Sequence, residues 1–225
     1  MEYGDIGASA DTVPFADVPA QLDTLPDGTP SVMYGDVSGY AEYNHQQGEN
    51  IFGFQEDCGL MSSSDVLNQF GIPASESDVV EHAALNGECD IDPANLSDSG
   101  GTSPADQAQI LGDYGLPAHV ESGQSMEDLA SQVEQGHGVI ADVNAGYLWQ
   151  NGNFVGNGQT NHAITVTGVA RDPSTGQIQG FYINDSGDGK SAEFVPAATM
   201  AKAWTDAGGI AVVTDAVHPA TQAQA

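Results

Sequence analysis

One cysteine of the chain, Cys58, has the sequence setting of a nucleophile. It lies in the run Gln55-Glu56-Asp57-Cys58-Gly59-Leu60, directly before a segment whose pattern predicts a helix. The unpaired N–H groups and the positive end of the dipole at a helix N-terminus stabilise a thiolate. Such a cysteine can attack a carbonyl carbon if a base removes its proton and a third group orients that base.

Candidates for the base and for its orienting group follow much later in the chain. His162 begins an apolar, alternating run at 161–170 that predicts a strand, and residues 178–185 predict the next strand. The turn residues Asp172-Pro173-Ser174-Thr175-Gly176 between the two strands indicate a hairpin, whose ends lie at one edge. His162 and Asp185 are therefore expected to be neighbours.

Together these residues resemble the catalytic motifs of the papain-like cysteine peptidases, and within that family the double-glycine peptidases that process bacteriocin leaders. A Cys-Gly helix start, a histidine that opens a strand and a later carboxylate occur here in the same order, as Cys58, His162 and Asp185. The resemblance covers about residues 50–215. It implies an α+β, papain-like fold in which N-terminal helices pack on an antiparallel β-sheet, and it implies a Cys-His-Asp triad.

Two positions depart from the family's pattern. The family's glutamine, a side-chain donor of the oxyanion hole, usually lies further from the cysteine than Gln55 lies from Cys58. The last motif reads Asn184-Asp185-Ser186-Gly187 instead of Asp-Pro, which keeps the carboxylate and loses a rigid turn. The resemblance therefore implies Gln55 as a candidate oxyanion donor, beside the backbone N–H of Cys58.

The implied chemistry is acyl transfer through an acyl-enzyme, and the sequence leaves its outcome open. Hydrolysis of a peptide or isopeptide bond in a polypeptide substrate makes the protein a cysteine peptidase, with no cofactor and no metal. Deamidation or acyl transfer by the same triad, as in an effector or toxin, is the alternative, and a catalytically idle papain-like binding module is another. Because the chain contains no transporter segment, cleavage after a double glycine is not expected to carry over.

The charge balance excludes some partners. The chain has 32 acidic residues against three lysines and arginines, which gives a formal net charge of −29. Nucleic acids and anionic membrane surfaces are bound chiefly through cationic side chains, so neither is an expected partner. The same charge favours a basic polypeptide substrate, although it does not locate a specificity pocket. The sequence indicates neither an oligomeric state nor the reason for the scarcity of lysine and arginine.

The sequence shows no signal for secretion through a signal peptide or for membrane insertion. The first residues, Met1-Glu2-Tyr3-Gly4-Asp5-Ile6-Gly7, lack the cationic start and the apolar core of a secretory signal peptide. No apolar run approaches the length of a transmembrane helix. We therefore expect a bacterial protein that is cytoplasmic or exported by a route independent of a signal peptide.

Three segments are expected along the chain. They are an acidic, partly ordered N-terminal arm at 1–45, a catalytic domain at 46–216 and a C-terminal tail at 217–225. Hydrophobic periodicity and capping residues predict helices at 58–70, 76–86, 103–114, 125–135 and 197–206. Alternating patterns predict strands at 118–121, 138–143, 161–170, 178–185, 192–195 and 209–214.

Other residues that could carry chemistry are expected to be structural. Cys89 is expected to be unpaired, with a disulfide to Cys58 as the alternative. The polar loop at 87–102 holds several oxygen ligands, but the spacing of an EF-hand would place Ala94 where an oxygen is required, which favours a solvated loop. No partner can be identified from the sequence for the remaining histidines, which are His45, His82, His119, His137 and His218.

Overall fold

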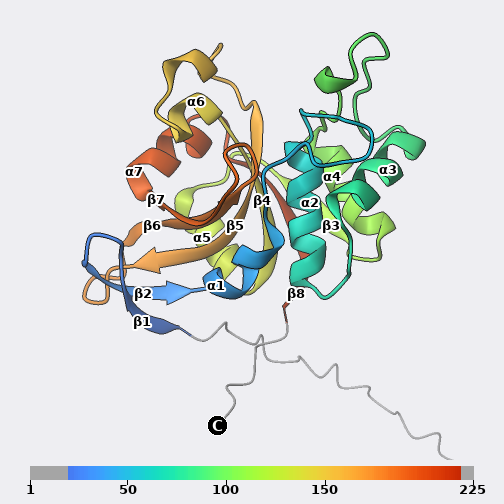
Figure 1. The fold of residues 1–225 in the computed structure, drawn as a ribbon. Coiled ribbons are helices and arrows are strands. Elements are labelled where there is room, and N and C mark those ends of the chain that lie inside the picture. The colour runs from blue at the N-terminus through green and yellow to red at the C-terminus, as the bar shows by residue number, and fades with distance from the viewer. Residues whose placement is uncertain (1–19, 219–225) are drawn as a thin grey trace, which may run out of the picture.

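An eight-stranded antiparallel sheet forms the centre of the computed structural model, which describes residues 20–218 (Figure 1). The strands follow the order β1-β2-β5-β4-β8-β3, and in addition β6 pairs with β5 and β7 with β6. Their bounds are β1 Gln21–Thr24, β2 Pro30–Tyr34, β3 Ala118–Glu121, β4 His137–Val143, β5 His162–Arg171, β6 Ile178–Asp185, β7 Lys190–Pro196 and β8 Ile210–Val217.

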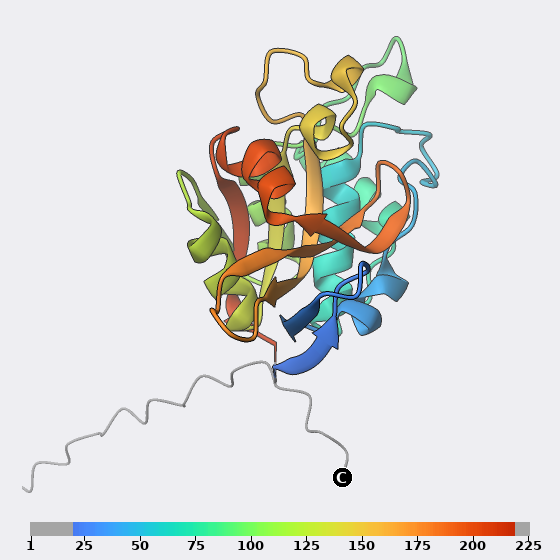
Figure 2. The ribbon, with the colours of Figure 1, turned by 90° about the vertical axis from the view of Figure 1, so that its left-hand side faces the viewer.

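Helices cover both faces of this sheet, as the two views in Figures 1 and 2 show. One face packs against α2, α3 and α4, and the other against α5, α6 and α7. The helices are α1 Val37–Tyr40, α2 Cys58–Gln69, α3 Glu76–Asn86, α4 Pro104–Asp113, α5 Met126–Glu134, α6 Ala145–Leu148 and α7 Ala197–Met200. Short helical turns are η1 Ala41–Tyr43, η2 Leu96–Asp98, η3 Gly152–Phe154 and the π-helical η4 Ala201–Thr205. This is the α+β, papain-like layout that the resemblance implied.

Alternation along β4 divides the interior into two cores. Val139, Ala141 and Val143 belong to the core under α5 and α7, whereas Ile140 belongs to the core under α2 and α4. Successive side chains of a strand point to opposite faces. Asp142 therefore shares the α2 side of the sheet with Ile140, at the end of β4.

Helix α2 is buried along nearly its whole length even though it carries several polar residues. The Ser63 hydroxyl donates to the Gly59 carbonyl (2.8 Å), and the Ser64 hydroxyl donates to the Ala74 carbonyl (2.7 Å). Asn184 of β6 donates to the Asp65 carboxylate (3.0 Å), which joins the helix to the sheet. Buried polar groups need such partners, so these bonds fix the rotation of α2 and the direction of its first residue.

The helices at 76–86, 103–114 and 125–135 are confirmed, and each begins at a serine. Ser75, Ser103 and Ser125 are the N-caps of α3, α4 and α5, and each forms a capping box with an aspartate three residues later. These reciprocal bonds satisfy backbone donors that the first helical turn leaves free. The last predicted helix is present as α7 followed by η4, where Trp204 is fully buried and its indole N–H donates to the Ile210 carbonyl (2.7 Å).

The described part of the expected N-terminal arm differs from the prediction. Strands β1 and β2 form a hairpin, and β2 pairs with the end of β5 from Val32 to Tyr34. Pro26 lies in the hairpin loop and Pro30 begins β2, two positions where a proline disturbs no sheet hydrogen bond. These two prolines therefore lie at the limits of the strands and do not prevent strand formation. Residues 1–19 of the arm and 219–225 of the expected tail lie outside the described residues.

Among the helices that the structure describes, none combines the length and the apolar character needed to span a membrane.

Candidate active site

Cys58 is the first residue of α2 and lies partly exposed at the end of that buried helix. The extended segment before it is held by the loop at 87–102, because Gln55 N–H donates to the Ser97 carbonyl (3.2 Å) and Glu56 N–H to the Ser99 carbonyl (3.1 Å). Residues 90–98 of the loop are exposed, as expected of a solvated loop, and its backbone also supports the segment beside the cysteine. Gly59 follows Cys58 where a Cβ would lie 2.1 Å from the Thr102 hydroxyl.

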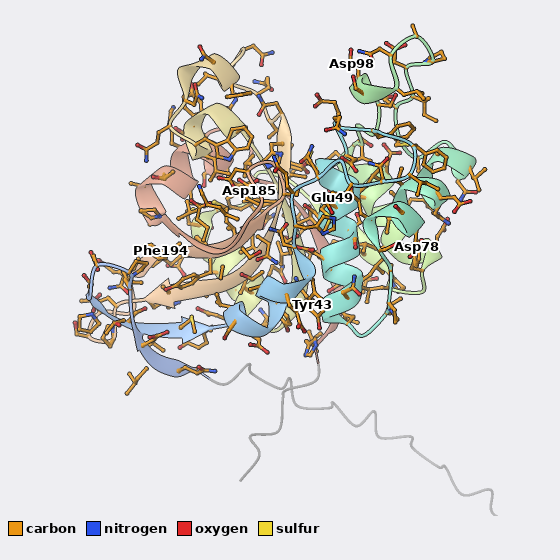
Figure 3. All side chains as sticks on the ribbon, in the orientation of Figure 1. Tyr43, Glu49, Asp78, Asp98, Asp185 and Phe194 are labelled. Atoms are coloured by element: carbon orange, nitrogen blue, oxygen red, sulfur yellow. The ribbon has the colours of Figure 1, made fainter. Side chains whose placement is uncertain are left out.

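His162 and Asp185 are neighbours on adjacent strands. His162 begins β5, Asp185 ends β6, and the imidazole Nε2 lies 2.7 Å from Asp185 Oδ1 (Figure 3 labels Asp185). Both side chains are buried. The Asp185 carboxylate also accepts from the Gly187 N–H (2.9 Å) and from the Trp149 indole N–H (2.7 Å). Three donors therefore fix the carboxylate, and the carboxylate fixes the ring.

Cys58 and Asp185 both influence the ionisation of His162. Burial lowers the pKa of His162, but hydrogen bonds with Asp185 and with Cys58 outweigh burial and raise the pKa to about 10. Burial would raise the pKa of Asp185, and the hydrogen bonds from His162 and Trp149 instead hold it below its usual value. Because Nε2 faces Asp185, Nδ1 is the nitrogen left for the thiol. The structure thus brings together the three residues that the sequence selected.

A second acidic group is buried directly beside Cys58. Burial and the nearby Glu76 raise the pKa of Asp57 well above its ordinary value, which favours its protonated form. Asn50 donates to the carboxyl groups of Asp57 (2.9 Å) and Glu76 (3.3 Å), and His45 lies 2.7 Å from Glu76. Protonation of Asp57, which these surroundings favour, reduces the negative charge next to the thiol.

Two cavities meet at Cys58 and His162. One, of about 270 Å³, lies against Trp149, Phe154 and Gly187, and three glutamines, Gln46, Gln47 and Gln55, line it. The other, of about 230 Å³, lies against the start of α4 and the end of β4, where Gln107 and Asp142 line it. A chain laid across the cysteine can therefore enter a cavity on each side.

Gln55 lines the first cavity together with Cys58, which is the location expected of an oxyanion donor. Its side-chain amide nitrogen donates to the Gly48 carbonyl (3.2 Å), and its backbone carbonyl accepts from the amide of Gln47 (2.6 Å). The Gln47 amide oxygen also accepts from the Ser186 hydroxyl (3.1 Å). The sequence interpretation chose one glutamine of this group and missed Gln46 and Gln47, which precede the cysteine by a longer interval.

The other histidines have hydrogen-bonding partners that the sequence did not reveal, which agrees with the expectation that they are structural. His45 lies 2.7 Å from Glu76, His82 lies 3.1 Å from Asp113, and His119 lies 2.7 Å from Asp215. His137 bonds the Thr214 carbonyl (2.6 Å) and His218 the Gln69 carbonyl (2.5 Å). Each partner is distant in sequence and is brought near by the fold. None of these pairs lines the two cavities at Cys58.

Both cysteines are free, which agrees with an unpaired Cys89. Burial, followed by the acidic neighbours Asp90 and Asp106, raises the pKa of Cys89 to about 11. Within residues 20–218, two groups of side chains have the spacing of metal ligands, His82 with Glu88 and Asp113, and Asp185 with Asp188 and Glu193. The first is explained by histidine–carboxylate pairing. In the second, Asp188 and Glu193 pair with Lys190, and Asp185 pairs with His162.

The layout of helices and sheet defines the class of papain-like cysteine peptidases, and comparison with known proteins gives the family. The Peptidase_C39 like family matches residues 34–212, so the chain belongs to that family. The match begins upstream of the domain boundary expected at residue 46. A function of the cysteine-peptidase kind follows from this membership and from the fold.

Two solved structures are similar to the chain. A C39-like peptidase from Bacillus anthracis has a TM-score of 0.51 and 18% identity, over 78% of this chain and 99% of that chain. A double glycine motif protease from an AMS/PCAT transporter, in complex with its leader peptide, has a TM-score of 0.46 and 16% identity, over 76% of this chain and 94% of that chain. Comparison with curated proteins gives no match.

Proposed function

We propose that the protein is an active cysteine peptidase that hydrolyses polypeptides through Cys58, His162 and Asp185. The observation that carries this proposal is the position of His162, which is bonded to Asp185 through Nε2 and lines the same two cavities as Cys58. An imidazolium beside a thiol at a helix N-terminus favours a thiolate–imidazolium pair. A merely structural histidine needs neither the thiol nor a buried carboxylate with three donors.

In the first step, the Cys58 thiolate attacks the carbonyl carbon of the scissile amide and forms the S–C bond. His162 then gives its proton to the amide nitrogen, the C–N bond breaks and the amine leaves. In the second step, a water molecule gives a proton to the neutral His162 and attacks the thioester carbon. The S–C bond breaks, the carboxylic acid leaves, and Asp185 keeps the imidazole in the tautomer that both steps require.

The oxyanion formed in each step requires donors near Sγ. The backbone N–H of Cys58, at the start of α2, is one, and an amide from the glutamine-lined cavity is the second. Gln55 is the candidate from the sequence, and one of the two N–H groups of its amide already donates to the Gly48 carbonyl. One such donor is typically worth roughly 3–4 kcal/mol of transition-state stabilisation.

The test follows alkylation of Cys58 by iodoacetamide as a function of pH, in the wild type and in His162→Ala. A rate that stays high well below pH 7 in the wild type and collapses in the variant supports the ion pair. A single rise near pH 8.5 in both proteins, the behaviour of an ordinary thiol, would overturn the catalytic role.

Cleavage itself is tested with a peptide library made from a denatured proteome. Mass spectrometry should find new peptide termini with the wild type and none with Cys58→Ser, a variant that retains the shape of the site. Deamidated or amine-linked products without new termini would show that the same triad catalyses deamidation or acyl transfer instead of peptide hydrolysis.

A further inference from the structure

The cavity on the α4 side of Cys58 is lined by buried acceptors. Its wall includes Asp142 from β4, Gln107 from α4, Thr102 and Glu56, together with Cys58 itself. Asp142 is 8% exposed and Gln107 is 1% exposed. The Gln107 amide donates to Asp142 Oδ1 at 3.4 Å, a long and weak hydrogen bond.

Two oxygen atoms in this wall have no donor among the described residues. They are Asp142 Oδ2 and Gln107 Oε1, both buried. A buried acceptor without a donor costs about 1–3 kcal/mol, and more when it is charged. Because both atoms are acceptors, a group that carries several N–H donors can pair with both at once.

No lysine or arginine of this chain can supply those donors. The chain contains only three such residues, and each is engaged elsewhere. Arg171 pairs with Glu127 and Glu134, Lys190 with Asp188 and Glu193, and Lys202 with Asp206. A lysine or arginine that pairs with Asp142 would therefore come from another molecule.

We propose that this cavity binds an arginine or lysine side chain of the peptide substrate, next to the scissile bond, and that Asp142 determines this specificity. The inference rests on the proposed function and names its substrate class. A guanidinium group can donate to Asp142 and Gln107 at once, and an ammonium group can do so with two of its three protons. The exposed carboxylate of Glu56 lies at the same cavity and adds to its negative field.

The charge state of Asp142 agrees with this role. Burial raises the pKa of Asp142 to about 6, although the Gln107 hydrogen bond and the nearby His162 both lower it. Asp142 is therefore ionised in a neutral buffer. The influence of His162 also defines the competing explanation, in which Asp142 acts only through the imidazolium and binds no substrate.

The experiment uses two peptidyl chloromethyl ketones that differ only in charge, one with arginine and one with the neutral isostere citrulline. Cys58 displaces chloride and forms a stable thioether, which mass spectrometry locates. A second pair moves the arginine or citrulline one residue further from the ketone. The two pairs thus probe the first and the second residue on the acyl side of the scissile bond. The rate constants are measured at pH 7.5, with free cysteine as the reference for intrinsic reactivity.

In the wild type, the arginine reagent should react at least about tenfold faster than the citrulline reagent in one of the pairs. Asp142→Asn should bring that ratio close to one, and Glu56→Gln, whose exposed site carries little folding risk, should lower it in part. Glu81→Gln removes one exposed charge from α3 and should leave the ratio unchanged. A wild-type ratio of one in both pairs would overturn the subsite even if Asp142→Asn failed to fold.

Two further outcomes are distinguishable. If Asp142→Asn slows both reagents equally, Asp142 acts through His162 and the cationic subsite is wrong. If the wild type reacts with all reagents no faster than free cysteine, the proposed peptidase function fails, and the subsite fails with it.

Discussion

Trp149 is a residue whose role becomes visible only in three dimensions. Its indole N–H donates to Asp185 Oδ2, and its ring packs against His162 with centroids 5.2 Å apart. It therefore positions the carboxylate from one side and shields the imidazole from another. Phe154 in turn contacts the Trp149 ring edge-on, which holds it in place.

The charge of Asp185 should set the pH range over which Cys58 reacts. Asp185→Asn keeps the size of the side chain and removes the carboxylate that raises the pKa of His162. We expect iodoacetamide alkylation at pH 6 to fall at least about tenfold, since one pKa unit corresponds to a tenfold change in the ionised population. At pH 9 the difference should become small.

Trp149→Phe provides the graded version of that change, because it keeps an aromatic ring and loses only the N–H. A smaller loss of rate at pH 6 is expected, in the same direction. The control is Trp204→Phe, which loses a buried indole hydrogen bond in the core. If Trp204→Phe shifted the pH profile as Trp149→Phe does, both effects would reflect general loosening and not the position of Asp185.

The loop at 87–102 acts as a support for the start of α2. Asp90 N–H donates to the Gly101 carbonyl (2.8 Å), Gly100 N–H donates to the Asp90 carbonyl (2.9 Å), and Ser99 is fully buried. Gly100 has a φ of +107° and lies against Asp57, where an added Cβ would come within 2.8 Å of the Asp57 Cβ. Residues next to the nucleophile are thus placed by an element remote from the sheet.

Gly100→Ala should therefore damage both stability and reactivity. The positive φ alone costs roughly 1–3 kcal/mol for a residue with a Cβ, and the clash moves Asp57 and the neighbouring Cys58. Gly87→Ala is the matched control, because Gly87 has a φ of +75° with open space around its Cβ position. Urea unfolding should show a loss in both variants, whereas Cys58 alkylation should slow only in Gly100→Ala. Normal alkylation in a folded Gly100→Ala would show that the loop does not position the site.

Local signals predicted most of the elements and the neighbourhood of the triad. The serine caps of α4 and α5, the turn at 172–176 and the alternation of β5 and β6 are encoded within short stretches, so His162 and Asp185 could be placed side by side. The role of each residue in catalysis stays a prediction. Strands β1 and β2 could not be found in this way, because their stability comes from the hairpin that they form and from the pairing of β2 with β5, and not from a pattern of their own.

Contacts between distant segments explain what the sequence did not reveal at the site. The sequence shows Asp142 only as one more residue of a buried strand, because the single bond to its Oδ1 and the unpaired Oδ2 depend on where α4 places Gln107. The Asp57–Glu76 pair joins the start of α2 to the start of α3, and His45 reaches it from a third segment. No spacing rule links these positions.

At the scale of the whole molecule, an excess of negative charge coexists with carboxyl groups buried in the interior. Burial raises the pKa of Asp65 to about 7, and burial also raises the pKa values of Asp57 and Asp142. A carboxyl group whose folded pKa exceeds its unfolded pKa binds more protons in the folded state. Its contribution favours folding at low pH and is lost as the pH rises from about 4 through the folded value.

The free energy of unfolding should therefore decrease between pH 5.5 and pH 8.5. Asp65 is 1% exposed, and its shift alone corresponds to a change on the order of 2 kcal/mol or more over its titration range. Asp65→Asn retains an acceptor for Asn184 and should flatten the pH dependence, chiefly by stabilising the protein at pH 8.5. Asp78→Asn, at the exposed cap of α3, is the control and should leave the slope unchanged, because the pKa of Asp78 is lowered and lies below this window.

Salt separates this effect from the repulsion among surface charges. The net charge of −29 also destabilises the compact state, but mobile ions screen exposed charges much more than buried ones. Urea unfolding is measured at pH 5.5 and 8.5, with and without added sodium chloride. In high salt, the wild type should retain the part of the pH dependence of the unfolding free energy that Asp65→Asn removes. If high salt abolished the slope in the wild type, surface repulsion would be its whole cause, and Asp65 would not be a determinant of stability.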